Sequence, residues 1–180
     1  MKKLSVKKLV TTALLLALLI AVQQFRWIQQ FFVGQYISGT LINAILIVAA
    51  VWVGLIPGIA IGILSPLFAL LITPGPMMQA LPQLVPVIML GNTAIVVCSW
   101  VLRRNHLISG MALGSLVKAA IIWGGVSLLV VPLFGSGLPE PMRITVTTTW
   151  TFNQLITAFL GSYLVLLIRG RLDKAIGLVD

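Results

Sequence analysis

Long apolar segments alternate along the chain with short polar or Gly/Pro-rich stretches. A transmembrane helix needs about 20 mostly apolar residues, and six segments meet or approach that length. We expect them at approximately 9–25, 40–55, 57–73, 83–102, 107–132 and 148–168. Between the second and third segments, "GLIPG" (54–58) supplies Gly and Pro for a tight turn. The pattern predicts an all-α integral membrane protein, a six-transmembrane-helix bundle that residues 1–180 form as a single transmembrane domain.

The composition indicates that the bilayer is the solvent of these segments. Hydrophobic residues make up 59% of the chain, charged residues 8%, and the mean hydropathy is +1.13, whereas a soluble domain carries about 25% charged residues. The formal net charge of +9 would suit nucleic acid. The basic residues lie mostly at the ends of apolar segments, however, and form no stripe interleaved with aromatic residues. We therefore expect the lipid bilayer as a partner and no nucleic acid.

The distribution of lysine and arginine predicts that both the N- and C-termini are cytoplasmic. With six spans and the N-terminus inside, nine of the twelve basic residues fall on the inner side, namely Lys2, Lys3, Lys7, Lys8, Arg103, Arg104, Arg169, Arg171 and Lys174. The outer connections carry only Arg26 and Arg143, and Lys118 lies within a span.

The N-terminal stretch "MKKLSVKKLVTTALLLALLIAV" has the basic and apolar regions of a signal peptide. No clean small-x-small cleavage site precedes "QQFRW", and cleavage would leave five spans with their ends on opposite sides. We therefore expect the stretch to remain as the first span.

The residue types needed for catalysis or metal binding occur in no recognisable arrangement. Cys98 and His106 are the only cysteine and histidine, so they form no metal cluster. The spans hold no carboxylate pair and no Ser/His/Asp set, and the chain lacks the phosphate-binding motif GxxxxGKS/T. We expect no enzyme activity, no cofactor and no metal, so that any coupled ATP hydrolysis belongs to separate subunits.

A few polar side chains inside the spans are candidates for a substrate-binding site. Lys118 lies near the membrane midplane, where an ionisable group costs about 2.5–3.5 kcal/mol. No expected span offers an acid to pair with it, so Lys118 is neutralised, meets a ligand, snorkels or contacts a partner protein, or has a structural role. The other candidates are amides and tryptophans, namely Asn43, Asn92, Trp123, Trp150, Asn153 and Gln154. Such amides either line a pocket for a small polar molecule or hold helices together.

Three outer connections, 26–39, 73–82 and 134–146, are long and rich in aromatic, Pro or Gly residues. Connections of this kind either cover a site or simply join two spans. The polar residues in the outer halves of the spans favour a site beneath them.

Ala13, Ala17 and Ala21 repeat every fourth position in "ALLLALLIA" (13–21) and share one face of the first helix. In lipid, helix association depends on close packing, because a leucine buried between helices is in no more apolar surroundings than a leucine in contact with acyl chains. The stripe of small residues therefore predicts a close helix contact, either within the bundle or with another protein.

The order of several motifs resembles the S components of energy-coupling factor (ECF) transporters, the substrate-binding membrane subunits of vitamin importers. The motifs are the basic N-terminus followed by "TTALLLALLIA", then "INAILIVAAVWVGLIPGIAIGILSPLFALL" (42–71), "PQLVPVIMLGN" (82–92), "SLVKAA" (115–120) and "QLITAFLGSYL" (154–164). The resemblance covers nearly the whole chain.

The resemblance implies a multi-pass protein of the prokaryotic plasma membrane that binds a vitamin-like small molecule near the outer surface and topples to release it inside. The implied partners are a transmembrane coupling protein and two ATPase subunits of an ECF module, which together form an ABC importer. Ala13, Ala17 and Ala21 map onto the family's docking face for the coupling protein. Among related vitamins, Lys118, with Arg143, favours a substrate that carries a carboxylate or a strong acceptor.

Two other classes of function stay open at this point. A stand-alone facilitator or small secondary carrier would move its solute in cells that lack any ECF ATPase. A non-transporting membrane scaffold would have a filled interior at Asn92, Trp123 and Asn153, with no cavity beneath the outer connections.

Overall fold

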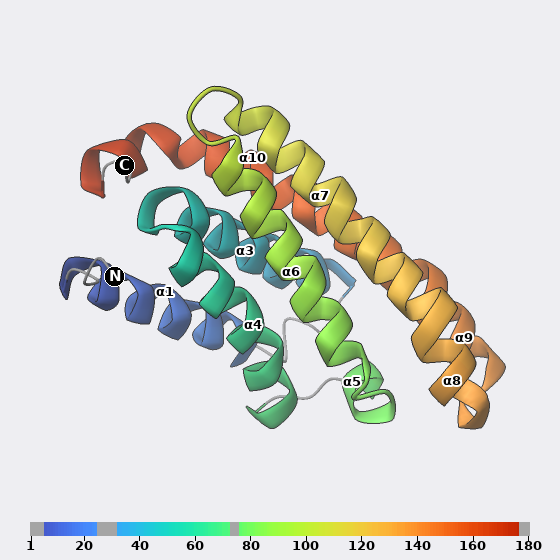
Figure 1. The fold of residues 1–180 in the computed structure, drawn as a ribbon. Coiled ribbons are helices and arrows are strands. Elements are labelled where there is room, and N and C mark those ends of the chain that lie inside the picture. Colours follow the sequence, from blue (N-terminus) through green and yellow to red (C-terminus); the bar gives the residue numbers. More distant parts are fainter. Residues whose placement is uncertain (1–5, 25–31, 73–75, 177–180) are drawn as a thin grey trace.

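The computed structural model describes residues 6–24, 32–72 and 76–176. Within these ranges the chain is helical without strands, and six helices are long and apolar enough to cross a membrane. The predicted all-α bundle of six transmembrane helices is confirmed, whereas the cytoplasmic location of both termini stays a prediction. Figure 1 shows the start of α1 (Val6–Gln24) and the end of α10 (Thr151–Ala175) at the same end of the bundle.

The six spans combine α-helices with short π-helical turns, and the first span is α1 alone. The next three are α3 (Phe32–Val48) with η1 (Ala49–Val53), α4 (Leu55–Ile72), and α6 (Leu84–Val101). The fifth joins α7 (Leu107–Gly124), η2 (Gly125–Val130) and α8 (Val131–Phe134). The sixth joins α9 (Glu140–Thr145), η4 (Val146–Trp150) and α10. Two short helices, α5 (Pro76–Ala80) and η3 (Gly135–Gly137), lie in the connections.

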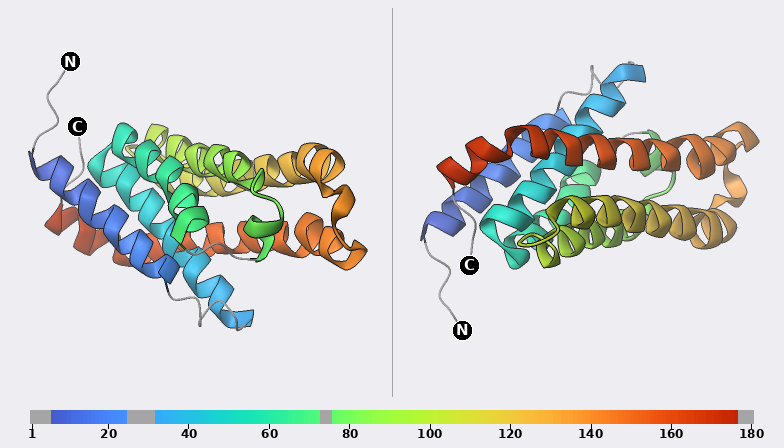
Figure 2. Two further views of the ribbon diagram at one scale, coloured as in Figure 1. Left: turned by 90° about the horizontal axis from the view of Figure 1, so that it is seen from below. Right: turned by 90° about the horizontal axis from the view of Figure 1, so that it is seen from above.

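The second span forms the centre of the bundle. Residues 43–53 are buried without interruption, which is the pattern of a helix surrounded by protein on all sides. The other helices pack around it: α10 lies along α3, α6 lies along both α4 and α7, and α1 contacts α3 and α4 (Figure 2). By contrast, most of α1 is exposed, and its buried side chains are Leu19, Val22 and Gln23.

Glycines allow the closest helix contacts. A Cβ atom on Gly161 of α10 would lie 2.7 Å from Asn43 Cβ and 2.8 Å from the Thr40 carbonyl oxygen of α3. A Cβ atom on Gly110 of α7 would lie 2.8 Å from the Cys98 carbonyl oxygen of α6. Small residues at these positions let two backbones approach, which is how helices gain packing energy in lipid.

The turn between the second and third spans is shorter than expected. Gly54, with φ of 137°, is the one residue between η1 and α4, and this backbone conformation strains any residue with a side chain. Pro57 and Gly58, expected in the turn, lie in the first turn of α4 and are buried. Proline is tolerated there because the first N–H groups of a helix have no intrahelical partner.

Two of the expected outer connections are largely helical. In the stretch 26–39, α3 begins at Phe32, and its polar residues are satisfied within the fold: Ser38 Oγ donates to the Gly34 carbonyl oxygen over 2.9 Å, and Tyr36 bonds to α10. In the stretch 134–146, only Leu138 and Pro139 lie outside helices. Residues 25–31 and 73–75 lie outside the described residues.

Candidate functional site

Lys118 lies in the centre of the bundle and is 2% exposed. Its ammonium group donates to Asn43 Oδ1 over 2.6 Å and to Asn92 Oδ1 over 2.8 Å. Among the described residues, no carboxylate forms an ion pair with it. Two neutral amide oxygens from α3 and α6 therefore stand where an acidic partner would be expected.

The nitrogen atoms of the same two amides donate further hydrogen bonds, within α3 and to other helices. Asn43 Nδ2 donates to the Gly39 carbonyl oxygen over 2.9 Å and to Thr157 Oγ1 of α10 over 3.4 Å. Asn92 Nδ2 donates to the Gly62 carbonyl oxygen of α4 over 3.2 Å. These bonds turn both carbonyl oxygens toward Lys118, and they connect α3, α4, α6, α7 and α10 through one buried polar cluster.

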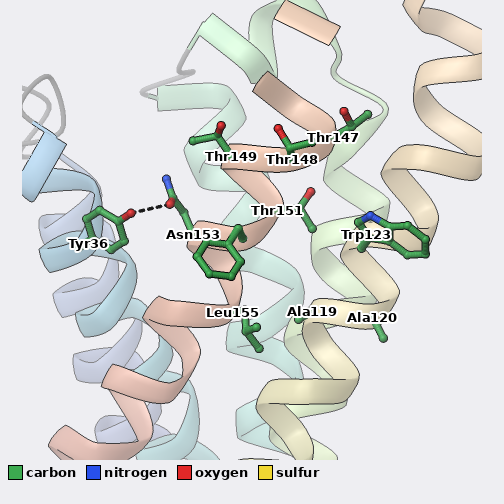
Figure 3. A pocket seen from close by; sticks show the side chains of 11 residues that line it. Tyr36, Ala119, Ala120, Trp123, Thr147, Thr148, Thr149, Thr151, Asn153 and Leu155 are labelled. Carbon is green, nitrogen blue, oxygen red and sulfur yellow. Dashed lines mark hydrogen bonds between the residues drawn. The ribbon is translucent and has the colours of Figure 1, made fainter. Parts of the chain in front are cut away.

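A separate cavity of about 680 Å³ lies between the second, fifth and sixth spans. Its described walls come from α3, α7, η4 and α10, and consist of Tyr36, Ala119, Ala120, Trp123, Thr147, Thr148, Thr149, Thr151, Phe152, Asn153 and Leu155. Figure 3 shows Tyr36 and Trp123 on opposite sides, with the threonines between them. The walls are thus aromatic rings, methyl groups and neutral polar groups.

One hydrogen bond fixes the polar corner of this cavity. Tyr36 Oη donates to Asn153 Oδ1 over 2.7 Å and joins α3 to α10 (Figure 3). Asn153 Nδ2 in turn reaches Gln35 Oε1 at 3.5 Å. Asn153 is buried, so its amide is held in one orientation at the cavity wall.

The predicted binding residues divide between the two polar regions. Trp123 and Asn153 line the cavity, whereas Lys118, Asn43 and Asn92 form the buried cluster. Two candidates line neither. Trp150 packs against the apolar cluster around Leu84 and Ile122, and the Gln154 carbonyl oxygen accepts a hydrogen bond from Thr157 Oγ1 at 3.2 Å. Arg143, suggested as a further contact, is exposed on α9 and does not line the cavity.

Tyr36 and the threonines of the cavity wall are not among the binding residues predicted from the sequence. The available signal was "TTTWTF" (147–152), a run of hydroxyl groups at one end of the last span. Threonines inside helices commonly bond to the carbonyl four residues earlier, so the run alone gave no reason to expect a binding surface.

The alanine stripe of the first helix faces away from the bundle. Ala13, Ala17 and Ala21 are all exposed, while Leu19 and Val22 pack into the core. Within the described chain the stripe therefore makes no close contact of the kind that its spacing predicts.

The family model "ECF transporter, substrate-specific component" matches residues 7–169. No curated protein and no solved structure matches the chain. The match confirms the resemblance found in the sequence, and together with the six helices it supports a multi-pass protein of the cell membrane. The family consists of substrate-binding transporter subunits rather than enzymes. This chain belongs to the family of the substrate-specific components of ECF transporters.

Proposed function

We propose that the chain captures a small water-soluble vitamin or a related micronutrient from outside the cell with high affinity, and delivers it by docking to an ECF energising module. The observation that carries this proposal is the cavity of about 680 Å³ between α3, α7, η4 and α10. Cavities that enclose small molecules measure about 300–1,000 Å³ and combine apolar walls with a few placed polar groups. Tyr36, Trp123 and Asn153 supply both kinds of group.

The same cavity counts against a ligand-free scaffold. A scaffold would need a filled interior at Asn92, Trp123 and Asn153. Asn92 is packed and hydrogen-bonded, but Trp123 and Asn153 border open volume. Van der Waals contacts are lost around any space that stays empty, so a bundle with no ligand would gain stability by closing it.

The exposed face of α1 supports docking to a transmembrane coupling protein. Ala13, Ala17 and Ala21 lie about 6 Å apart along the helix, and all three are exposed. A partner helix can approach such a stripe closely and gain dispersion contacts that acyl chains do not provide as well. The two ATPase subunits of the module would then act through the coupling protein.

The experiment is mass spectrometry of small molecules extracted from the detergent-purified chain, grown with a mixture of vitamins and compared with a mock purification. A vitamin-sized compound near one molecule per chain supports the proposal. Phe152→Ala, which opens the cavity wall, should lower this amount, whereas Phe159→Ala on the same helix should not, because Phe159 is exposed outside the cavity. A chain that retains no compound from the supplemented medium contradicts it.

A further inference from the structure

The threonines of the cavity wall have already used their hydroxyl hydrogens. Thr147 Oγ1 donates to the Arg143 carbonyl oxygen over 2.9 Å, and Thr148 Oγ1 donates to the Ile144 carbonyl oxygen over 2.7 Å. Thr151 Oγ1 donates to the Val146 carbonyl oxygen over 3.1 Å, five residues earlier, where the π-helical η4 meets α10. A hydroxyl group has one hydrogen and two lone pairs. These three side chains can therefore only accept a hydrogen bond from a bound molecule.

The Tyr36 hydroxyl group is also fixed at the cavity wall, because it donates its hydrogen to Asn153 Oδ1 over 2.7 Å. The donors that the described walls retain are neutral, namely the Thr149 hydroxyl, the indole N–H of Trp123 and one N–H of Asn153. The described walls thus offer the hydroxyl oxygens of three threonines as acceptors, beside a few uncharged donors.

No charged side chain is among the described residues that line the cavity. Lys118 is adjacent in sequence to Ala119, but its ammonium group is directed to Asn43 and Asn92 and the residue is 2% exposed. A carboxylate or phosphate group that binds in the cavity would lose part of its hydration and would meet no opposite charge among the described walls, which is unfavourable. The described walls therefore select against an anionic group.

Aromatic side chains complete the recognition surface. Tyr36, Trp123 and Phe152 border the cavity, and Figure 3 shows Tyr36 and Trp123 facing it from two sides. Aromatic rings pack well against other flat rings, and their faces attract cations. A flat ring fits this surface whether it is neutral or positively charged.

We infer that the solute is a neutral or cationic ring compound without a carboxylate or phosphate group. Its N–H or O–H groups donate hydrogen bonds to the threonine wall, which consists of Thr147, Thr148 and Thr151. This inference rests on the proposed function, because it takes the cavity as the solute site. It replaces the preference for a carboxylate that the sequence drew from Lys118.

Matched pairs of compounds test the inference on the purified full chain by equilibrium dialysis. Each pair differs in one anionic group: nicotinamide and nicotinate, pyridoxine and 4-pyridoxate, thiamine and thiamine phosphate, riboflavin and its phosphate. The compound extracted from the chain, with its own acidic counterpart, is added to the panel. We expect the member without the acid to bind at least 10-fold more tightly in the pair that binds.

Variants of the threonine wall show whether the tight binding depends on its acceptors. Thr148→Val removes one acceptor at nearly constant shape and should weaken binding by about 3- to 10-fold, while Thr148→Ser should restore it. Thr145→Val is the matched control, because Thr145 makes the same bond to the carbonyl oxygen four residues earlier, at 2.7 Å, outside the cavity.

The outcomes separate the inference from the proposed function. Equal or tighter binding of the acidic member, or unchanged affinity in Thr148→Val, overturns the inference. The proposed function still stands in that case if a vitamin is found bound to the chain. If the extract is empty and no compound of the panel binds, the proposed function fails and the inference fails with it.

Discussion

Lys118 of α7 and Asn92 of α6 meet in the buried centre of the bundle, where the ammonium group donates to the amide oxygen over 2.8 Å. Asn43 of α3 supplies the second acceptor at 2.6 Å. A buried polar group is tolerated when hydrogen bonds replace its hydration. Here the replacement comes from neutral amides, so Lys118 connects three helices and lies apart from the cavity.

Lys118→Met should lower the free energy of unfolding by about 1–3 kcal/mol, because two buried amide oxygens lose their donor. Solute affinity should change by less than about threefold, since Lys118 does not line the cavity. Thermal unfolding in detergent and equilibrium dialysis measure the two effects. Leu116→Met on the exposed face of α7 is the control. A 10-fold loss of affinity at unchanged stability would instead assign Lys118 to the solute.

Gly161→Ala should destabilise the bundle by about 1–3 kcal/mol through overpacking. The added Cβ would lie 2.7 Å from Asn43 Cβ and 2.8 Å from the Thr40 carbonyl oxygen, so α3 and α10 must separate. Gly170→Ala on the same helix is the matched control, because nothing lies within 4 Å of its added Cβ. Since alanine favours a helix over glycine, the control should unfold at the same or a higher temperature. Similar melting points for both variants would show that the contact is loose.

Tyr36→Phe should weaken solute binding by about 3- to 10-fold, because it frees the Asn153 amide that Tyr36 Oη holds at 2.7 Å. Tryptophan fluorescence titration with the extracted compound measures the change. Tyr163→Phe is the control, since Tyr163 is 60% exposed and lies outside the cavity. Equal affinity in both variants would mean that the Tyr36–Asn153 bond does not shape the site.

Ala17→Trp should abolish co-purification of the chain with the coupling protein while solute affinity stays nearly constant. The bulky ring would keep a partner helix away from the exposed stripe, and α1 contributes none of the described cavity residues. Leu116→Trp on α7 controls for the cost of an added ring facing lipid. Loss of both properties, or of neither, would contradict a role of Ala17 in docking.

The number and type of the helices could be predicted from the sequence because apolar length alone defines a transmembrane helix. The start of α3 could not, since Tyr36 and Ser38 look like loop residues until their hydrogen-bond partners are known. Tyr36 bonds to a residue 117 positions away, and no local pattern contains that information.

The same limit applies to the candidate site. Depth in the membrane suggested that Lys118 needed partners, but Asn43 and Asn92 lie 75 and 26 positions away along the chain. All three were therefore grouped with Trp123 and Asn153 in one expected pocket. The helix packing separates them, because Lys118 and Trp123 point to different faces of α7: the former is buried and the latter is 55% exposed.

The order of the three cluster residues along the chain bears on how the protein is made. A lysine at the centre of a lone helix costs about 2.5–3.5 kcal/mol to insert. Asn43 and Asn92 both precede Lys118, so the ribosome completes α3 and α6 before α7 leaves it. The Lys118 side chain is therefore synthesised after both of its acceptors, so α7 can meet them as soon as it enters the bilayer.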